Sequence, residues 1–308
     1  MVNAKTLVRE RLLFKMSIFL IVVLVLLYSL QTLFCKFYSD NYSGKKELSS
    51  PVLCVTQSIA IALISLAFAG FEFKISLVSV IFGALNAIVL FGYNTSLIKA
   101  GDRGSYAFMN MMMLFGGIFV PLVYTSITTG EFPSTIECIA IISMIIACVL
   151  MNIENIKLGG SKVSYYVFCL LLFIFNGLYG TLLKVQEQYN ASESQEMVII
   201  SYGLMGVIAL VQLLAKEKKD TAAAFRFNRK CALFLALFLI ISGLAVNVLV
   251  LLLGYLNVAV LYTVDNGGVM MLSALYSITL FKEKATPLKI VGIIIAVASL
   301  CVLGYNSI

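Results

Sequence analysis

The chain contains no histidine and no tryptophan, and only 12% of its 308 residues are charged. Histidine is the commonest metal ligand and general base in proteins, so its absence removes the side chain around which many such sites are built. The seven cysteines lie mostly inside apolar runs without a CxxC pair, and we interpret them as small hydrophobic residues. No phosphate-binding GxxxxGK(S/T) motif occurs. These absences argue against a metal centre, a bound cofactor, an enzyme active site and an ATP-driven pump.

The distribution of charge gives a second exclusion. The net charge of +7 arises from 22 basic and 15 acidic residues. The basic residues are spread over many short segments between apolar runs and do not gather in one domain, as they do in nucleic-acid-binding proteins. Lysines and arginines in such connections orient membrane helices and contact anionic lipid head groups. The lipid bilayer, and not a nucleic acid, is the expected partner.

Hydrophobic residues make up 61% of the chain, and the mean hydropathy is +1.02. A bilayer-spanning helix needs about 20 apolar residues, and the chain offers ten such runs with no room for a soluble domain. The runs are continuous and do not alternate, so helices are predicted and strands are not. The first run has full span length and no small-residue cleavage site, so a cleaved signal peptide is not expected. The predicted spans are 16–37, 50–69, 75–98, 105–129, 135–152, 163–185, 196–214, 231–254, 258–281 and 286–304.

The last fifty residues form a unit that recurs in the first half of the chain. The run Val258–Phe281 ends at the turn 282–285, and a second run starts at Thr286-Pro287. Thr286 is a predicted N-cap, and proline fits the first helical position because its missing N–H has no helical partner there. The corresponding run, turn and run of the first copy are 107–129, 130–133 and 134–152. Such a repeat restricts the possible folds.

The opening helices of the two halves also correspond. Tyr28–Lys36 and Asn176–Lys184 begin 148 residues apart, and each is an apolar segment that turns small and polar before ending in lysine. Because each half holds five spans, an odd number, the second half must enter the membrane from the opposite side. Inverted repeats are typical of secondary transporters. We therefore predict an all-α integral membrane protein with two inverted five-helix repeats, 1–155 and 156–308. The charge distribution leaves the orientation of the termini open.

Asp265 is the one acidic residue well inside a predicted span. A central aspartate costs ~2.5–3.5 kcal/mol on insertion scales, so such residues usually face a partner or a water-filled cavity. Tyr262 lies three residues earlier on the same helical face. One interpretation is a carboxylate that handles a proton or cation in a transport cavity. The other is a carboxylate bonded to a neighbouring tyrosine or asparagine, and the sequence does not choose between them.

Neutral polar residues form stripes on other spans. Amides and phenols there either bond to neighbouring helices, at about 0.6 kcal/mol on average, or line a wet cavity. Hydrogen bonding between helices explains any single residue, whereas a set distributed over spans 1, 3, 4, 6 and 9 favours a cavity. Tyrosine rings also offer faces on which an aromatic or cationic ligand can stack. The predicted substrate-binding residues are Tyr28, Gln31, Asn86, Tyr93, Asn110, Asn176, Tyr179, Tyr262 and Asp265.

Two further patterns have alternative interpretations. Lys36 and Lys184 stand where spans are predicted to end, so they extend to the head groups or, less readily, bind an anionic substrate. Small residues form one face of the last span and of its counterpart in the first half, which indicates close helix packing or a dimer contact. These faces are Gly292, Ala296 and Ser299, and Ala140, Ser143 and Ala147. The chain is accordingly expected to be a monomer or a homodimer.

The chain resembles the drug/metabolite transporter superfamily, in its ten-helix EamA-like branch. The resemblance is carried by the two lysine-ending segments, the acidic turns at Gly130-Glu131 and Lys282-Glu283, and the glycine-bearing final helix 290–304. It implies two inverted five-helix repeats, a cavity lined by helices 1, 3, 4, 6, 8 and 9, and export or exchange of metabolites, amino acids or drugs. The chain departs from the family pattern in lacking a tryptophan-glycine pair near the end of the first helix, and in having Phe-Lys-Glu where Leu-Gly-Glu is usual. The membrane glutamate of four-helix relatives has no counterpart in the first span.

The predicted function is secondary transport of a small organic solute across the plasma membrane, the inner membrane in a bacterium, by alternating access. Asp265 is the candidate for coupling transport to a proton. A flippase for a lipid-linked carrier or a phospholipid-like substrate is the alternative, because it would share the fold and would place Lys36 or Lys184 near phosphate. The identity of the substrate, the coupling ion and the direction of transport are not encoded in a recognisable motif.

Overall fold

A computed structural model describes residues 4–71, 74–130, 134–157, 163–217, 221–253 and 258–306. Within these ranges the chain forms α-helices joined by short turns, with no β-strand. The α-helices are α1 (Ala4–Asn41), α2 (Ser49–Phe68), α3 (Leu77–Gly101), α4 (Tyr106–Thr129), α5 (Thr135–Lys157), α6 (Val163–Asn190), α7 (Ser194–Lys216), α8 (Arg229–Leu253), α9 (Val258–Thr279) and α10 (Pro287–Asn306). The 3₁₀-helices are η1 (Lys46–Leu48), η2 (Ala191–Glu193) and η3 (Thr221–Phe225).

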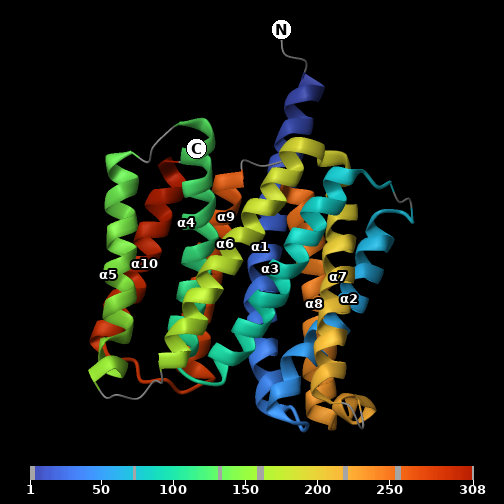
Figure 1. Cartoon of the computed structure of the whole chain (residues 1–308). Helices are drawn as coiled ribbons and strands as arrows, with labels where there is room; N and C mark the ends of the chain where they lie inside the picture. The colour runs from blue at the N-terminus through green and yellow to red at the C-terminus, as the bar shows by residue number, and fades with distance from the viewer. Residues whose placement is uncertain are drawn as a thin grey trace.

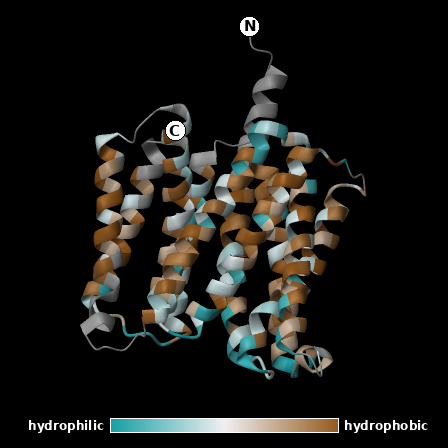
Figure 2. Cartoon of the chain, viewed as in Figure 1, coloured by the Kyte–Doolittle hydropathy of each residue, from teal (hydrophilic) through white to brown (hydrophobic). Residues whose placement is uncertain are grey.

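The helices have the length and composition of membrane-spanning segments. Six stretches of the described residues are long and apolar enough to cross a bilayer, and α5 and α10 hold shorter apolar stretches. Hydrophobic residues follow the lengths of the helices, whereas hydrophilic residues gather toward the ends (Figure 2). Large apolar side chains also point outward from many helices, including Ile59, Ile88, Ile142 and Leu233. The fold is therefore that of an α-helical membrane protein.

Helices of the two predicted halves pack against each other throughout the bundle. The main contacts pair α1 with α8 and α9, α2 with α7 and α8, α3 with α6 and α7, α4 with α6 and α9, and α5 with α10. Figure 1 shows α1 descending from the end that bears the N-terminus, whereas α6 ascends toward that end. In the same view α5 and α10 stand together at one edge of the bundle (Figure 1).

The small-residue faces are found at this edge. Ala140 and Ala147 of α5, and Ala296 and Ser299 of α10, are buried where the two helices pack. Side chains of this size let helix backbones approach closely, which is how helices associate in lipid. Helix packing within the chain thus explains the pattern without a second copy.

Glycine makes an even closer approach possible between α4 and α6. A Cβ atom placed on Gly116 would lie 1.9 Å from the carbonyl oxygen of Phe173, and one on Gly177 would lie 2.5 Å from the carbonyl oxygen of Gly116. Two backbones in contact leave no room for a side chain. These two glycines therefore allow α4 and α6 to pack with their backbones in contact.

Several helix starts follow the predicted chemistry. The last helix begins at Pro287, and the Thr286 hydroxyl accepts a hydrogen bond from the Lys289 N–H at 3.4 Å, which confirms the predicted cap. Ser76 and Ser105 cap α3 and α4 in the same manner. The C-terminal end of α4 is at Gly130, whose φ of 73° is the left-handed conformation that glycine adopts readily.

A carboxylate from a distant turn completes the start of α3. Glu193 of η2 accepts hydrogen bonds from the Ser76 N–H at 2.9 Å, from the Ser76 hydroxyl at 2.6 Å and from the Ser79 hydroxyl at 2.6 Å. The Ser76 and Ser79 hydroxyls lower the pKa of the Glu193 carboxyl from 4.5 to about 2. The turn between α6 and α7 is thereby bound to the N-terminus of α3, where a negative charge is favoured by the helix dipole.

The helix boundaries correct one prediction. Spans 1 and 6 were expected to end near Lys36 and Lys184, but α1 continues to Asn41 and α6 to Asn190. Both lysines therefore lie inside helices, and Lys36 forms an ion pair with Asp40 one turn further on, at 2.7 Å. The i,i+4 spacing of this pair stabilises a continuing helix. The predicted turn residues 131–133 lie outside the described residues. Of the predicted midpoint 154–162, residues 158–162 lie outside them as well, and 154–157 belong to α5.

Candidate functional site

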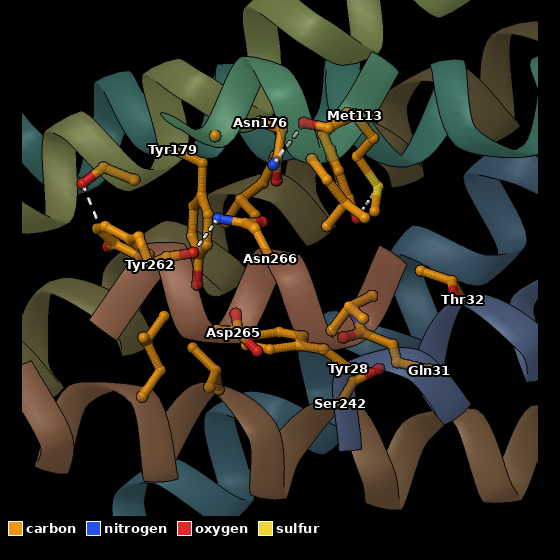
Figure 3. A pocket seen from close by; sticks show the side chains of 18 of the residues that line it. Tyr28, Gln31, Thr32, Met113, Asn176, Tyr179, Ser242, Tyr262, Asp265 and Asn266 are labelled. Carbon is orange, nitrogen blue, oxygen red and sulfur yellow. Dashed lines mark hydrogen bonds between the residues drawn. The ribbon is translucent and has the colours of Figure 1, made fainter. Parts of the chain in front are cut away.

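A polar cavity lies in the middle of the bundle, where helices from both halves meet. The space in it that water-sized molecules can occupy is about 70 Å³. Its walls come from α1, α3, α4, α6, α7, α8 and α9, as Figure 3 shows for most of the side chains. The polar lining residues are Tyr28, Gln31, Thr32, Tyr93, Asn176, Tyr179, Tyr202, Ser242, Tyr262, Asp265 and Asn266.

Seven of the nine predicted site residues line this cavity: Tyr28, Gln31, Tyr93, Asn176, Tyr179, Tyr262 and Asp265. The other two do not. Asn86 is fully buried on the side of α3 that faces α7, where it donates a hydrogen bond to the Ser201 hydroxyl at 3.2 Å. Asn110 is also fully buried, and it donates to the Tyr106 carbonyl one turn earlier, at 2.9 Å. Neither amide lines the cavity, and the Oδ1 atom of each has no hydrogen-bond partner among the described residues.

Asp265 is 6% exposed and lines the cavity from α9. Its Oδ1 atom is buried and has no hydrogen-bond partner among the described residues. The neighbours that could have bonded to it are engaged elsewhere, because Tyr262 Oη donates to the Gly180 carbonyl at 3.4 Å and Asn266 Nδ2 donates to the Tyr262 carbonyl at 2.6 Å (Figure 3). The structure thus places this carboxylate at a cavity with one oxygen left without a donor.

Two more oxygen atoms of the cavity wall are in the same situation. Within the described part of the chain, neither the Tyr28 hydroxyl on α1 nor the Ser242 hydroxyl on α8 has a hydrogen-bond partner, although both atoms are buried. More than nine in ten buried polar groups in proteins are hydrogen-bonded, so each exception calls for an explanation. Seven other buried side-chain oxygens of the described chain also lack a partner, but the groups of Asp265, Tyr28 and Ser242 differ from them in lining a cavity, where a bound molecule can pair with them.

Other polar groups of the wall are held in place by the protein. Asn176 Nδ2 donates to the Met113 carbonyl at 2.9 Å, and the Tyr93 hydroxyl contacts the Met113 sulfur at 3.1 Å (Figure 3). Met113 lies on α4, so these bonds connect α3 and α6 to it. Part of the lining is therefore rigid framework, and part is available to a ligand.

The sequence interpretation missed four polar lining residues: Thr32, Tyr202, Ser242 and Asn266. Thr32 and Asn266 are each next to a predicted residue, Gln31 and Asp265. Ser242 is an isolated polar residue in an apolar run, whereas Tyr202 follows Ser201. The resemblance implied a contribution from helix 8, which Ser242 makes, but none from helix 7, which carries Tyr202.

A smaller pocket lies beside the cavity. Thr32 lines both spaces, and the wall of the smaller one also contains Cys35, Lys36 and Ser39 of α1. The Thr32 hydroxyl is hydrogen-bonded to the Tyr106 hydroxyl at 2.9 Å. This bond joins α1 to the first residue of α4 at a residue shared by the two pockets.

The turn after α9 also binds the start of α4. Glu283 Oε1 accepts a hydrogen bond from the Tyr106 N–H at 2.6 Å, and Oε2 accepts one from the Ser105 hydroxyl at 2.8 Å. Lys289 of α10 forms an ion pair with the same carboxylate. The Phe281 ring packs against the Tyr106 ring, with 4.6 Å between centroids. One acidic residue thus positions Tyr106, whose hydroxyl is bonded to Thr32.

Comparison with known proteins adds information on the fold. No family model matches the chain, and no curated protein matches it. Among solved structures 25 chains match, including one described only as "Crystal structure of protein". That structure superposes with a TM-score of 0.62 at 12% sequence identity, over 94% of this chain and 98% of the other. A protein of similar length therefore shares the overall arrangement of helices.

Proposed function

We propose that this chain is a secondary transporter that moves a small organic solute across the plasma membrane by alternating access. The observation that carries the proposal is the central cavity, whose wall combines helices from both halves and includes three buried polar groups without a hydrogen-bond partner in the described chain. Each such group costs free energy when left unpaired, and these three line a space that a solute can enter. A transported solute pairs with them for part of the cycle.

The proposed architecture is ten spanning helices in two inverted halves, 1–155 and 156–308. The helix contacts support it, because exchanging each helix with the one five positions later maps the main pairs onto one another. The pair α1–α8 becomes α6–α3, α4–α6 becomes α9–α1, and α5–α10 becomes itself. The opposite directions of α1 and α6 in Figure 1 are also those of an inverted repeat. Transporters with inverted repeats bind substrate at the repeat interface near the bilayer midplane.

Transport by alternating access needs a closure between the cavity and each face. The contacts of Tyr106 with Thr32 and Glu283 supply a closure at one end, because they hold α1, α4 and the turn after α9 together. Rocking of one half against the other would separate these elements. Membership of the EamA-like branch, with export or exchange as the direction of transport, is part of the same proposal.

The test is solute counterflow into proteoliposomes that contain the purified protein. Ser242→Trp fills the cavity from α8, and Leu244→Trp places the same side chain on the exposed side of that helix, where Leu244 is 38% exposed. We expect the wild type and Leu244→Trp to exchange at least one solute of a charged and neutral panel, and Ser242→Trp to exchange none. If no solute crosses, or if Ser242→Trp is as active as the wild type, the proposal is wrong.

The flippase alternative lacks a supporting observation. A lipid phosphate would need a cationic partner, yet none of the described residues that line the cavity is a lysine or arginine. Lys36, which borders the smaller pocket, is paired with Asp40. A water-soluble solute fits the cavity chemistry better than a phospholipid head group.

A further inference from the structure

We propose that the solute bound in the central cavity is an organic amine in its protonated form, with at least one N–H on the charged nitrogen. This inference rests on the proposed transport function and names the substrate class of that site. Its basis is the pattern of charge, hydrogen-bond acceptors and aromatic rings around Asp265. No other carboxylic acid and no basic residue is found among the described residues of the lining.

The charge of the cavity comes first. A carboxylate buried without a cationic partner is costly, because little water remains to solvate it. Asp265 is 6% exposed, and no ion pair or hydrogen bond to its Oδ1 occurs within the described chain. A ligand with a positive charge removes this cost, whereas an anionic ligand increases it. The cavity therefore selects for cations over anions.

The acceptors then restrict the kind of cation. Asp265 Oδ1 on α9 is a buried acceptor without a donor, and the hydroxyls of Tyr28 on α1 and Ser242 on α8, which can both donate and accept, line the same cavity. A primary ammonium group has three N–H donors arranged around one nitrogen. It can donate to the Asp265 carboxylate and to a hydroxyl oxygen, whereas a quaternary ammonium has no N–H and would leave Asp265 Oδ1 without a donor. The unpaired acceptors thus favour a primary or secondary amine.

The rest of the wall suits the organic part of such a ligand. Five tyrosines line the cavity: Tyr28, Tyr93, Tyr179, Tyr202 and Tyr262. The faces of aromatic rings attract cations and stack on other rings, so they accept both the ammonium group and an aromatic body. Aliphatic residues, among them Leu90, Val246 and Leu249, complete the lining. A small arylalkylamine combines the features that this surface recognises.

The experiment compares four ligands that share a phenylethyl group by the thermal stability of the purified protein in detergent. They are 2-phenylethylamine, its N,N,N-trimethyl derivative, the neutral 2-phenylethanol and the anionic 3-phenylpropanoate, with sodium chloride alone as a further condition. A ligand that binds the folded state raises its melting temperature. We expect the primary amine to give the largest shift, the quaternary amine a smaller one, and the alcohol and the anion none.

Two variants assign the effect to the carboxylate. Asp265→Asn should weaken binding of 2-phenylethylamine about 10- to 100-fold, because a charge-assisted hydrogen bond is lost. Asp102→Asn removes an exposed acid outside the cavity and should leave the affinity unchanged. If Asp265→Asn is less stable than the wild type, isothermal calorimetry at a temperature where both are folded gives the affinities directly.

The outcomes separate this inference from the transport proposal. Tighter binding of the alcohol or the anion, a stabilisation by sodium alone that the amine does not exceed, equal binding of the amine to Asp265→Asn, or no binding of any ligand overturns the amine assignment. The transport proposal survives these results if counterflow of a neutral or anionic solute is blocked by Ser242→Trp. It fails if no solute of any charge is exchanged.

Discussion

Replacing Glu283 by glutamine should open the closure beside Tyr106. The carboxylate of Glu283 accepts hydrogen bonds from the Tyr106 N–H and the Ser105 hydroxyl and pairs with Lys289. Glutamine keeps the size of the side chain but has no charge and one acceptor oxygen. In Glu283→Gln the start of α4 is held less firmly, and the 7% exposed Lys289 loses its anion.

The size of the effect follows from these contacts. A hydrogen bond to a charged group contributes ~1.5–3 kcal/mol, about twice the value of a neutral one. Glu283 is partly exposed, so we take the lower end of this range for the loss. A loss of about 1.4 kcal/mol changes an equilibrium constant tenfold. The population in which the start of α4 has separated from the turn should therefore rise about tenfold.

Cys35 reports this opening without any engineered label. It is 2% exposed and lines the smaller pocket next to Thr32. Its reaction with a water-soluble maleimide, followed by mass spectrometry of the digested protein, should be about tenfold faster in Glu283→Gln, in proportion to the open population. Cys54, which is fully buried on α2, serves as the internal control. Glu217→Gln is the matched variant, because it removes an acid that pairs with Lys45 and not with α4.

Equal labelling of Cys35 in the wild type and Glu283→Gln would refute the reasoning. A parallel rise in the labelling of Cys54 would also refute it, because that result indicates general loosening of the bundle. A rise in Glu217→Gln of the same size would show that any lost ion pair has this effect.

Two further predictions concern stability. Glu193→Gln should lower the melting temperature above pH 4.5, and the difference from the wild type should vanish as the pH falls toward about 2. The reason is that a carboxyl with a lowered pKa loses its stabilising effect as it becomes protonated. A difference in melting temperature that does not change with pH contradicts this prediction. Gly116→Ala should destabilise the protein by about 1–3 kcal/mol or prevent folding, since its Cβ would overlap the Phe173 carbonyl. Gly203→Ala, whose Cβ meets nothing within 4 Å, should be neutral or stabilising by up to about 1 kcal/mol; equal melting temperatures of the two alanine variants would contradict the proposed α4–α6 contact.

The class of α-helical membrane proteins could be predicted from the sequence, because membrane-spanning helices are long runs of apolar residues. The positions of turns followed from cap residues, as at Thr286 and Pro287. The ends of α1 and α6 did not follow, because a helix continues past the last apolar residue wherever its polar residues find partners. The pair Lys36–Asp40 has the spacing that would have revealed this continuation.

The candidate site was predictable in part for a related reason. Polar residues in apolar helices are few, so those facing a common cavity stand out, and Asp265 with Tyr262 is the clearest case. Their spacing does not say which neighbour each face meets, however. Asn86 faces α7 and bonds to Ser201, although its residue type matches that of the lining amides. Such distinctions depend on how helices pack, which no single helix encodes.

The ring of tyrosines around the cavity gives the protein a built-in optical signal. The chain has 15 tyrosines and no tryptophan, so its near-ultraviolet emission comes from phenols alone. Five of those phenols line the cavity, and Asp265 belongs to the same lining. A ligand that enters should therefore alter the fluorescence of the unlabelled protein. A single tryptophan introduced anywhere in the chain would also be its only indole, and energy transfer from these phenols would report its distance from the cavity.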